Sequence, residues 1–203
     1  MPIEQVAGVI LAGGQATRMG GGDKCLLPLG GGETVLERIV SRIGPQVGCL
    51  ALNANGDPAR FATSNLPVLP DTLTDAGPLA GVLAAMHWAQ AQGCDAVVTV
   101  AGDTPFFPAD LVARLVAERA GQPVVMAATD RLHPVFALWD ISLAPVLAQA
   151  LDSGTRRVAA FAEAQGAVTV RFPQTEALDP FFNINTPDDL AQVQRLYRTR
   201  QVP

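Results

Sequence analysis

Short apolar runs alternate with amphipathic stretches through the first 120 residues of the chain. The apolar runs end at glycine, proline, aspartate or asparagine, and they predict strands at 6–11, 47–52, 66–69 and 95–101. Helices are expected between and after them, at 34–43, 58–63, 78–92 and 108–120. The alternation predicts a parallel sheet with right-handed crossover helices. The strand at 95–101 is the most apolar and is expected at its centre.

The remaining residues continue this pattern less regularly. Strands are expected at 123–128 and 134–139, which can pair as a hairpin, and at 167–172. Helices are expected at 142–151, at 155–165 and from Pro187 onward, with Thr186 as the N-cap of the last helix. The sequence contains no repeat, low-complexity tract or linker, so residues 1–203 are expected to form a single three-layer α/β domain with a mostly parallel sheet.

The composition fits a compact enzyme-sized domain. Apolar residues make up 49% of the chain, charged residues 16%, and the net charge is −5, which argues against a general nucleic-acid-binding protein. The three cysteines form no CxxC motif, which favours reduced thiols in the cytoplasm. The N-terminal residues MPIEQ lack the pattern of a signal peptide, and no apolar run is long enough to span a membrane.

A glycine-rich segment follows the first strand directly. It runs from Leu11 to Lys24, LAGGQATRMGGGDK, and contains five glycines. Glycine lacks a Cβ and tolerates positive φ, so such a loop can turn tightly and direct its backbone N–H groups at an anion. The segment matches neither the P-loop motif G-x-x-x-x-G-K-[ST] nor the dinucleotide-binding motif G-x-G-x-x-G. We therefore expect a phosphate-binding loop that differs from both of these types. An ordinary surface loop is the alternative.

This segment also contains two cations, Arg18 and Lys24. Lys24 is the single lysine of the chain, against thirteen arginines. A compact ammonium on a flexible stem suits a point-charge contact with phosphate, which the planar arginine fork makes differently. Lys24 is therefore a candidate phosphate ligand.

Polar side chains follow the other expected parallel strands. Asn53 ends the second strand, Asp71 follows the third and Asp103 the fourth. Ligands of open α/β sheets bind beyond the carboxyl ends of the strands. Asp103 is the candidate Mg²⁺ ligand, because Mg²⁺ needs only one or two protein carboxylates beside substrate phosphates. A local turn cap is the alternative for Asp103. Asn53 and Asp71 can contact a base or a ribose, or merely cap loops.

Near the C-terminus, Asn183 and Asn185 flank Ile184, so both amides face one side if the segment is extended. Amides suit a phosphate or the edge of a heterocycle, and capping of the last helix is the alternative. Arg156–Arg157 can be an anion contact or an exposed helix start. No Ser/His/Asp or Cys/His relay and no zinc spacing emerges, which favours a reaction that depends on positioning and charge neutralisation.

Taken together, these motifs resemble one family over nearly the whole chain. The resemblance rests on LAGG-x-x-x-RMGG with Lys24, on NAN at 53–55, and on Asp71 followed by GPLAG at 77–81. It continues with GDTP at 102–105, HP at 133–134 and NINTP at 183–187. The chain is similar to the molybdenum cofactor guanylyltransferases, which link GMP to the phosphate of molybdopterin. The extra glycines at 30–32 depart from the family pattern in a surface turn only.

The resemblance implies a nucleotidyltransferase of Rossmann-like type that uses GTP, molybdopterin and Mg²⁺. It places GTP on Leu11, Ala12, Gly13, Lys24, Asn53 and Asp71, and the metal on Asp103. It places Arg18, Asn183 and Asn185 toward the acceptor or the reacting phosphates. It divides the chain into a nucleotide-binding part, about 1–120, and an acceptor-binding part, about 121–203. It implies a cytoplasmic monomer with cofactor-insertion proteins and molybdoenzyme chaperones as partners, and no nucleic acid or membrane.

Other functions remain open at this point. Transfer of CMP or UMP to molybdopterin or another phosphorylated small molecule would use the same chemistry. A nucleotide-sensing module without catalysis is a third class, but such a protein has no need of both Lys24 and Asp103. An oxidoreductase that binds a dinucleotide is disfavoured, because its glycine motif is missing.

Overall fold

The structure is a computed structural model that describes residues 2, 5–13, 22–73, 76–174 and 179–199. Its main sheet has seven strands in the order β5-β4-β1-β6-β8-β7-β9. Their bounds are β1 Val6–Leu11, β4 Cys49–Asn53, β5 Val68–Leu69, β6 Ala96–Ala101, β7 Val124–Ala128, β8 Leu132–Asp140 and β9 Val168–Arg171. β8 is antiparallel to both of its neighbours, and the other adjacent pairs are parallel. The mostly parallel sheet, the central β6 and the pairing of β7 with β8 are confirmed.

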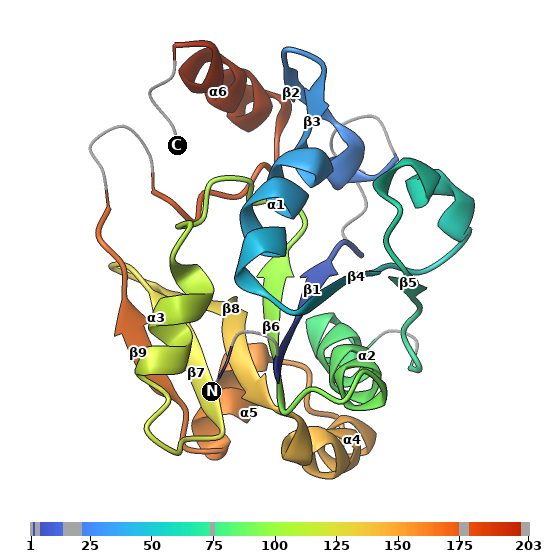
Figure 1. Cartoon of the computed structure of the whole chain (residues 1–203), viewed down its shortest axis with the longest axis vertical. Helices are drawn as coiled ribbons and strands as arrows, with labels where there is room; N and C mark the ends of the chain where they lie inside the picture. Colours follow the sequence, from blue (N-terminus) through green and yellow to red (C-terminus); the bar gives the residue numbers. More distant parts are fainter. Residues whose placement is uncertain (1, 3–4, 14–21, 74–75, 175–178, 200–203) are drawn as a thin grey trace.

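Helices cover both faces of this sheet (Figure 1), with bounds α1 Val35–Ile43, α2 Pro78–Ala91, α3 Leu111–Ala117, α4 Ala144–Asp152, α5 Val158–Ala164 and α6 Pro187–Arg198. One hydrophobic cluster joins α1, α3 and α6 to the sheet, and a second joins α2, α4 and α5 to it. Residues that are adjacent in β1 belong to different clusters, because successive side chains of a strand point to opposite faces of the sheet. The expected three-layer arrangement is confirmed.

A two-stranded hairpin lies outside the main sheet and was not predicted. It consists of β2, Pro28–Gly30, and β3, Glu33–Thr34, and it contacts α6 beside it (Figure 1). Tyr197 of α6 donates a hydrogen bond to the Glu33 carboxylate. The glycine-rich turn at 30–32 therefore joins two strands that are too short to show an alternating pattern.

Two expected helices differ from the structure. The segment 58–63 forms a 3₁₀ helix, Pro58–Ser64, which ends at Asn65 with a positive φ of 53°. The helix expected at 108–120 is restricted to α3, because the chain turns before Leu111 and because Ala120 and Gly121 both adopt positive φ. Among the described residues, shorter 3₁₀ turns lie at Lys24–Leu26, Gly44–Gln46 and Ile141–Leu143.

Strand register aligns the carboxyl ends of four parallel strands. Leu11 of β1 pairs with Asn53 of β4 on one side and with Ala101 of β6 on the other, and Asn53 pairs with Leu69 of β5. The candidate residues Gly13, Asp71 and Asp103 each follow one of these aligned residues by two positions. The topology thus gathers them along one edge of the sheet. In the part of the chain that the structure describes, no helix is long and apolar enough to cross a membrane.

Candidate active site

A cavity of about 430 Å³ opens at this carboxyl edge. Its walls come from the ends of β1, β4 and β6, from the start of α2 and from two segments of the second half of the chain. The lining residues that carry the argument are Leu11, Ala12, Gly13, Lys24, Asn53, Asn55, Asp71, Asp103 and Asn183. Every residue predicted to hold the nucleotide or the metal therefore borders one cavity of a size suited to a small ligand.

At the floor of this cavity, the backbone at Gly102 lies against the backbone at Leu11 and Ala12. The Gly102 N–H donates to the Leu11 carbonyl at 2.9 Å. A Cβ at position 102 would lie 3.0 Å from the Ala12 Cα and 3.1 Å from the Leu11 oxygen, closer than ordinary contacts. Glycine thus lets the chain after β6 pass against the start of the glycine-rich segment, which brings Asp103 to the cavity.

A polar cluster on the other side of the cavity joins Asn53, Asn55 and Asp71. The Asn53 amide donates to Asp71 Oδ1 at 2.8 Å and to the Leu69 carbonyl at 3.0 Å. The Asn55 amide donates to Asp71 Oδ2 at 2.8 Å, and the Asp71 backbone N–H donates to Asn55 Oδ1 at 2.8 Å. These contacts fix the Asp71 carboxylate, so it can accept hydrogen bonds from a ligand without first becoming ordered.

Gly81 of α2 makes room for this cluster. A Cβ at position 81 would lie 2.3 Å from Asn53 Oδ1, and Asn53 is already held by two hydrogen bonds. We expect Gly81→Ala to destabilise the protein by about 1–3 kcal/mol through overpacking, which exceeds the gain of about 1 kcal/mol in helix propensity. Urea unfolding measures this change. Gly44→Ala is the matched control, since a Cβ at Gly44 meets nothing within 4 Å; equal stability of both variants would contradict the packing argument.

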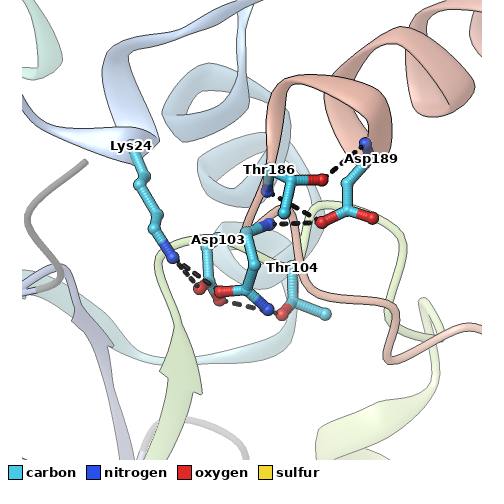
Figure 2. A network of polar contacts seen from close by, with 6 residues as sticks. Lys24, Asp103, Thr104, Thr186 and Asp189 are labelled. Carbon is cyan, nitrogen blue, oxygen red and sulfur yellow. Dashed lines mark hydrogen bonds and ion pairs between the residues drawn. The ribbon is translucent and has the colours of Figure 1, made fainter. Parts of the chain in front are cut away.

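Lys24 links the nucleotide side of the site to the C-terminal segment (Figure 2). Its Nζ donates to Asn185 Oδ1 at 2.6 Å and lies 3.5 Å from Asp103 Oδ2. The hydroxyl of Thr104 donates to the other Asp103 oxygen at 3.2 Å. Lys24 and Asp103 are 79 residues apart, and Lys24 and Asn185 are 161 apart. The predicted phosphate ligand and the predicted metal ligand therefore meet in space.

The donor set at Asp103 fits a cation that also binds a ligand. The described residues contain no group of three or more His, Cys, Asp or Glu side chains that can hold a metal ion by themselves. Asp103 offers one carboxylate at the mouth of the cavity, with 20% of its side chain exposed. This arrangement suits Mg²⁺, which fills its remaining positions with water and phosphate oxygens.

A second cavity of about 410 Å³ adjoins the first. The two share Ala101, Val135 and Asn183 as lining residues. The rest of the second cavity is lined by Arg131, Leu132, His133, Pro134, Phe136, Phe182, Asn185 and Asp189. Its wall combines one exposed cation, one carboxylate, the His133 ring, apolar side chains and two amides, and it lies mainly in the second half of the chain.

His133 is a packed residue of this wall. Its ring stacks on Phe181 with a centroid separation of 4.5 Å, and its Nε2 lies 2.8 Å from the Thr129 hydroxyl. Burial lowers the pKa of His133, and Arg131 acts in the same direction, although Asp179 opposes both. The neutral form is favoured, and the packing on Phe181 together with the Thr129 contact gives His133 a structural role within β8.

Cys25 lines the first cavity beside Lys24, but its thiol is unreactive. The side chain is 2% exposed, and burial together with the nearby Asp23 carboxylate raises the pKa to about 12. The thiolate that a nucleophile needs is scarce near neutral pH. The structure gives no support to a catalytic thiol.

This raised pKa gives a testable pH dependence. The folded protein keeps the Cys25 proton above pH 9, where the unfolded chain releases it. Stability is therefore fully present below about pH 9 and falls as the pH rises toward 12, by up to about 1.4 kcal/mol per pH unit. Urea unfolding at pH 8 and pH 10.5 should show this fall, and Cys25→Ala should reduce it. An identical fall in the variant would contradict the assignment to Cys25.

Most of the residues singled out from the sequence lie together around the two cavities, and three points differ. Arg18 lies outside the described residues, as do positions 14–21 of the glycine-rich segment, so its predicted role stays a prediction. Asn55 was not singled out as a ligand, although its two-residue spacing from Asn53 places both amides on one side of an extended chain. Arg131 carried no local signal, because one arginine before an apolar strand is common on protein surfaces.

The fold and the site define a nucleotidyltransferase. The model of the MobA-like NTP transferase domain matches residues 8–168. The molybdenum cofactor guanylyltransferase of Mesorhizobium japonicum is 55% identical over 202 residues, covering 96% of this chain and 97% of its own. That of Cereibacter sphaeroides is 48% identical over 191 residues, covering 94% and 96%. The chain belongs to the molybdenum cofactor guanylyltransferase family.

A solved structure shares this fold at a lower level of sequence similarity. The molybdopterin-guanine dinucleotide biosynthesis protein A of Archaeoglobus fulgidus superposes with a TM-score of 0.77 at 24% identity, covering 95% of this chain and 99% of that one. This match confirms the predicted fold class.

Proposed function

We propose that this protein transfers GMP from GTP to the terminal phosphate of molybdopterin, which forms the guanine dinucleotide cofactor and pyrophosphate. The observation that carries the proposal is the pair of adjoining cavities with Asp103 and Lys24 beside their shared wall. A transfer reaction needs two substrates held side by side with a charged group at the boundary. Membership of the guanylyltransferase family supplies the identity of the two substrates.

GTP is proposed to bind in the first cavity. Leu11, Ala12 and Gly13 offer backbone at the start of the glycine-rich segment, and Lys24 offers a cation for the phosphates. Asn53 and Asp71, now joined by Asn55, offer ordered acceptors and donors for the guanosine.

Mg²⁺ is proposed to be held by Asp103 together with phosphate oxygens of the nucleotide. When bound, it would neutralise negative charge on the reacting phosphates, an effect that can contribute several kcal/mol. Asp103 is suited to this role because its carbonyl accepts the Ile184 N–H at 2.9 Å and one carboxylate oxygen accepts from Thr104. Both contacts hold the carboxylate at the cavity mouth.

The acceptor is proposed to bind in the second cavity. Asn183 and Asn185 would donate to its phosphate or to its heterocycle, and Arg131, which is 64% exposed along its side chain, would add positive charge. Arg18 is proposed to act near the reacting phosphates. On this basis we propose a nucleotide-binding part at about 1–120 and an acceptor-binding part at about 121–203.

In this mechanism, the terminal phosphate oxygen of molybdopterin attacks the α-phosphorus of GTP in line with the departing pyrophosphate. Two anions must approach each other, and Lys24 lies at the boundary where their charges would meet. Asn183 borders both cavities and can orient both substrates. The protein thus contributes position and charge rather than a covalent intermediate.

A nucleotide panel tests this function. Pyrophosphate release should be measured with molybdopterin and Mg²⁺ in the presence of GTP, ATP, CTP or UTP. We expect release with GTP to exceed release with the other three, and omission of molybdopterin or Mg²⁺ to abolish it. Preferred use of CTP or UTP would overturn the choice of nucleotide, and release without an acceptor would indicate a hydrolase.

The proposal also includes a cytoplasmic, monomeric enzyme that passes its product to cofactor-insertion proteins or molybdoenzyme chaperones. The free thiols of Cys25, Cys49 and Cys94 fit a reducing compartment. Leu132 leaves 40% of its surface exposed at the rim of the second cavity, where the product would be released.

A further inference from the structure

The contact between Lys24 and Asn185 depends on how the backbone is held at Asn185. Asn185 Oδ1 accepts from Lys24 Nζ at 2.6 Å, and the direction of this side chain is set by the main chain that carries it. On one side the neighbouring Ile184 is fully buried, and its N–H donates to the Asp103 carbonyl at 2.9 Å. The chain is therefore fixed just before Asn185, and a second contact is needed after it.

Asp189 of α6 supplies that second contact (Figure 2). Its Oδ2 accepts the N–H of Thr186 at 2.8 Å and the N–H of Asn185 at 2.9 Å. The Thr186 hydroxyl in turn accepts the Asp189 N–H at 3.1 Å, which completes a capping box at the start of α6. A capping box requires only the bond to the N-cap residue. The bond to Asn185, one residue outside the helix, is additional.

The capping box of α1 shows the difference. There Glu37 Oε2 accepts the N–H of Thr34 at 2.7 Å and the Thr34 hydroxyl at 2.9 Å, both from the N-cap residue itself. In α6 the corresponding carboxylate accepts from two successive backbone N–H groups. Asp189 also lines the second cavity and lies close enough to Lys24 for their charges to interact.

Resting on the proposed transfer of GMP, we propose that Asp189 is a positioning residue for the reaction. By holding the Asn185 N–H, its carboxylate orients the Asn185 side chain toward Lys24 at the boundary of the two cavities. Asp189 touches neither reacting phosphate in this account and acts through Asn185. The start of α6 thereby holds Asn185, on the acceptor side of the site, in contact with Lys24 on the nucleotide side.

Three variants separate positioning from helix capping. Asp189→Ala removes both bonds, Asp189→Asn keeps an oxygen that can accept them, and Thr186→Ala removes the other half of the box while leaving Asp189 in place. We expect Asp189→Ala to lower kcat/KM for molybdopterin about tenfold, since small misplacements of contacting groups are costly. Asp189→Asn should recover most of this loss. Thr186→Ala should lower the melting temperature but leave kcat/KM within about twofold.

A double-mutant cycle tests the route through Asn185. If Asp189 acts through Asn185, Asp189→Ala should add little to the defect of Asn185→Ala. Additive losses, or equal kinetic losses in Asp189→Ala and Thr186→Ala, would overturn the proposal.

Amide hydrogen exchange gives a measure that does not depend on activity. The Asn185 N–H should lose protection in Asp189→Ala and keep it in Thr186→Ala, and equal protection in both would contradict the proposed contact. If the unmodified protein transfers no GMP while this exchange pattern holds, the proposed function fails and the positioning contact stands. If transfer is normal and the exchange pattern is absent, only the positioning role fails.

Discussion

Asp103→Asn should reduce GMP transfer by about a hundredfold to a thousandfold while leaving the fold intact. The substitution removes the one carboxylate proposed to hold Mg²⁺, whose charge neutralisation can contribute several kcal/mol, and each 1.4 kcal/mol is about tenfold in rate. The fold should survive, because the backbone bond from Ile184 is unaffected and an asparagine oxygen can still accept from Thr104. Single-turnover transfer with saturating GTP and Mg²⁺ measures the loss, and thermal unfolding checks the fold.

Asp57→Asn is the matched control for this variant. Asp57 is an exposed carboxylate that accepts the Ala59 N–H at 2.9 Å at the start of a 3₁₀ helix, and asparagine caps equally well there. The control removes the same charge away from the cavities and should transfer GMP at close to the normal rate. Near-normal transfer by Asp103→Asn would rule out Asp103 as the metal ligand.

The sequence predicted the central sheet because buried parallel strands form continuous apolar runs. β1 and β6 are such runs, and the polar residues after them had to lie at one edge once the strands were parallel. The hairpin of β2 and β3 could not be predicted in this way. Its strands have three and two residues, and its position depends on packing against α6, which is far away in the sequence.

The site was predictable to a similar extent. Residues at strand ends, such as Asn53 and Asp103, follow from the topology, since register fixes where each strand stops. The contact between Lys24 and Asn185 does not follow from the topology, because it joins two segments outside the sheet. Its geometry arises from the docking of α6 and from Asp189, and no local pattern specifies where such a segment comes to rest.

Lys24 supplies a positive charge at the boundary of the two cavities. Lys24→Met should weaken binding of GTP with Mg²⁺ by about tenfold to a hundredfold. It removes a charge-assisted contact to phosphate, which typically contributes about 1.5–3 kcal/mol. It also leaves the Asp103 carboxylate without its ammonium neighbour, so the free site becomes more repulsive to a triphosphate. Isothermal titration calorimetry at two salt concentrations measures the loss, which should shrink as salt screens the charges.

Lys24→Arg separates charge from shape. Arginine keeps the positive charge, but its planar fork cannot occupy the same point between Asn185 and Asp103. We therefore expect Lys24→Arg to bind GTP more tightly than Lys24→Met and to transfer GMP more slowly than the unmodified protein. Full recovery of both binding and rate by arginine would show that charge alone matters at this position. Unchanged GTP affinity in Lys24→Met would contradict the assignment of the first cavity to the triphosphate.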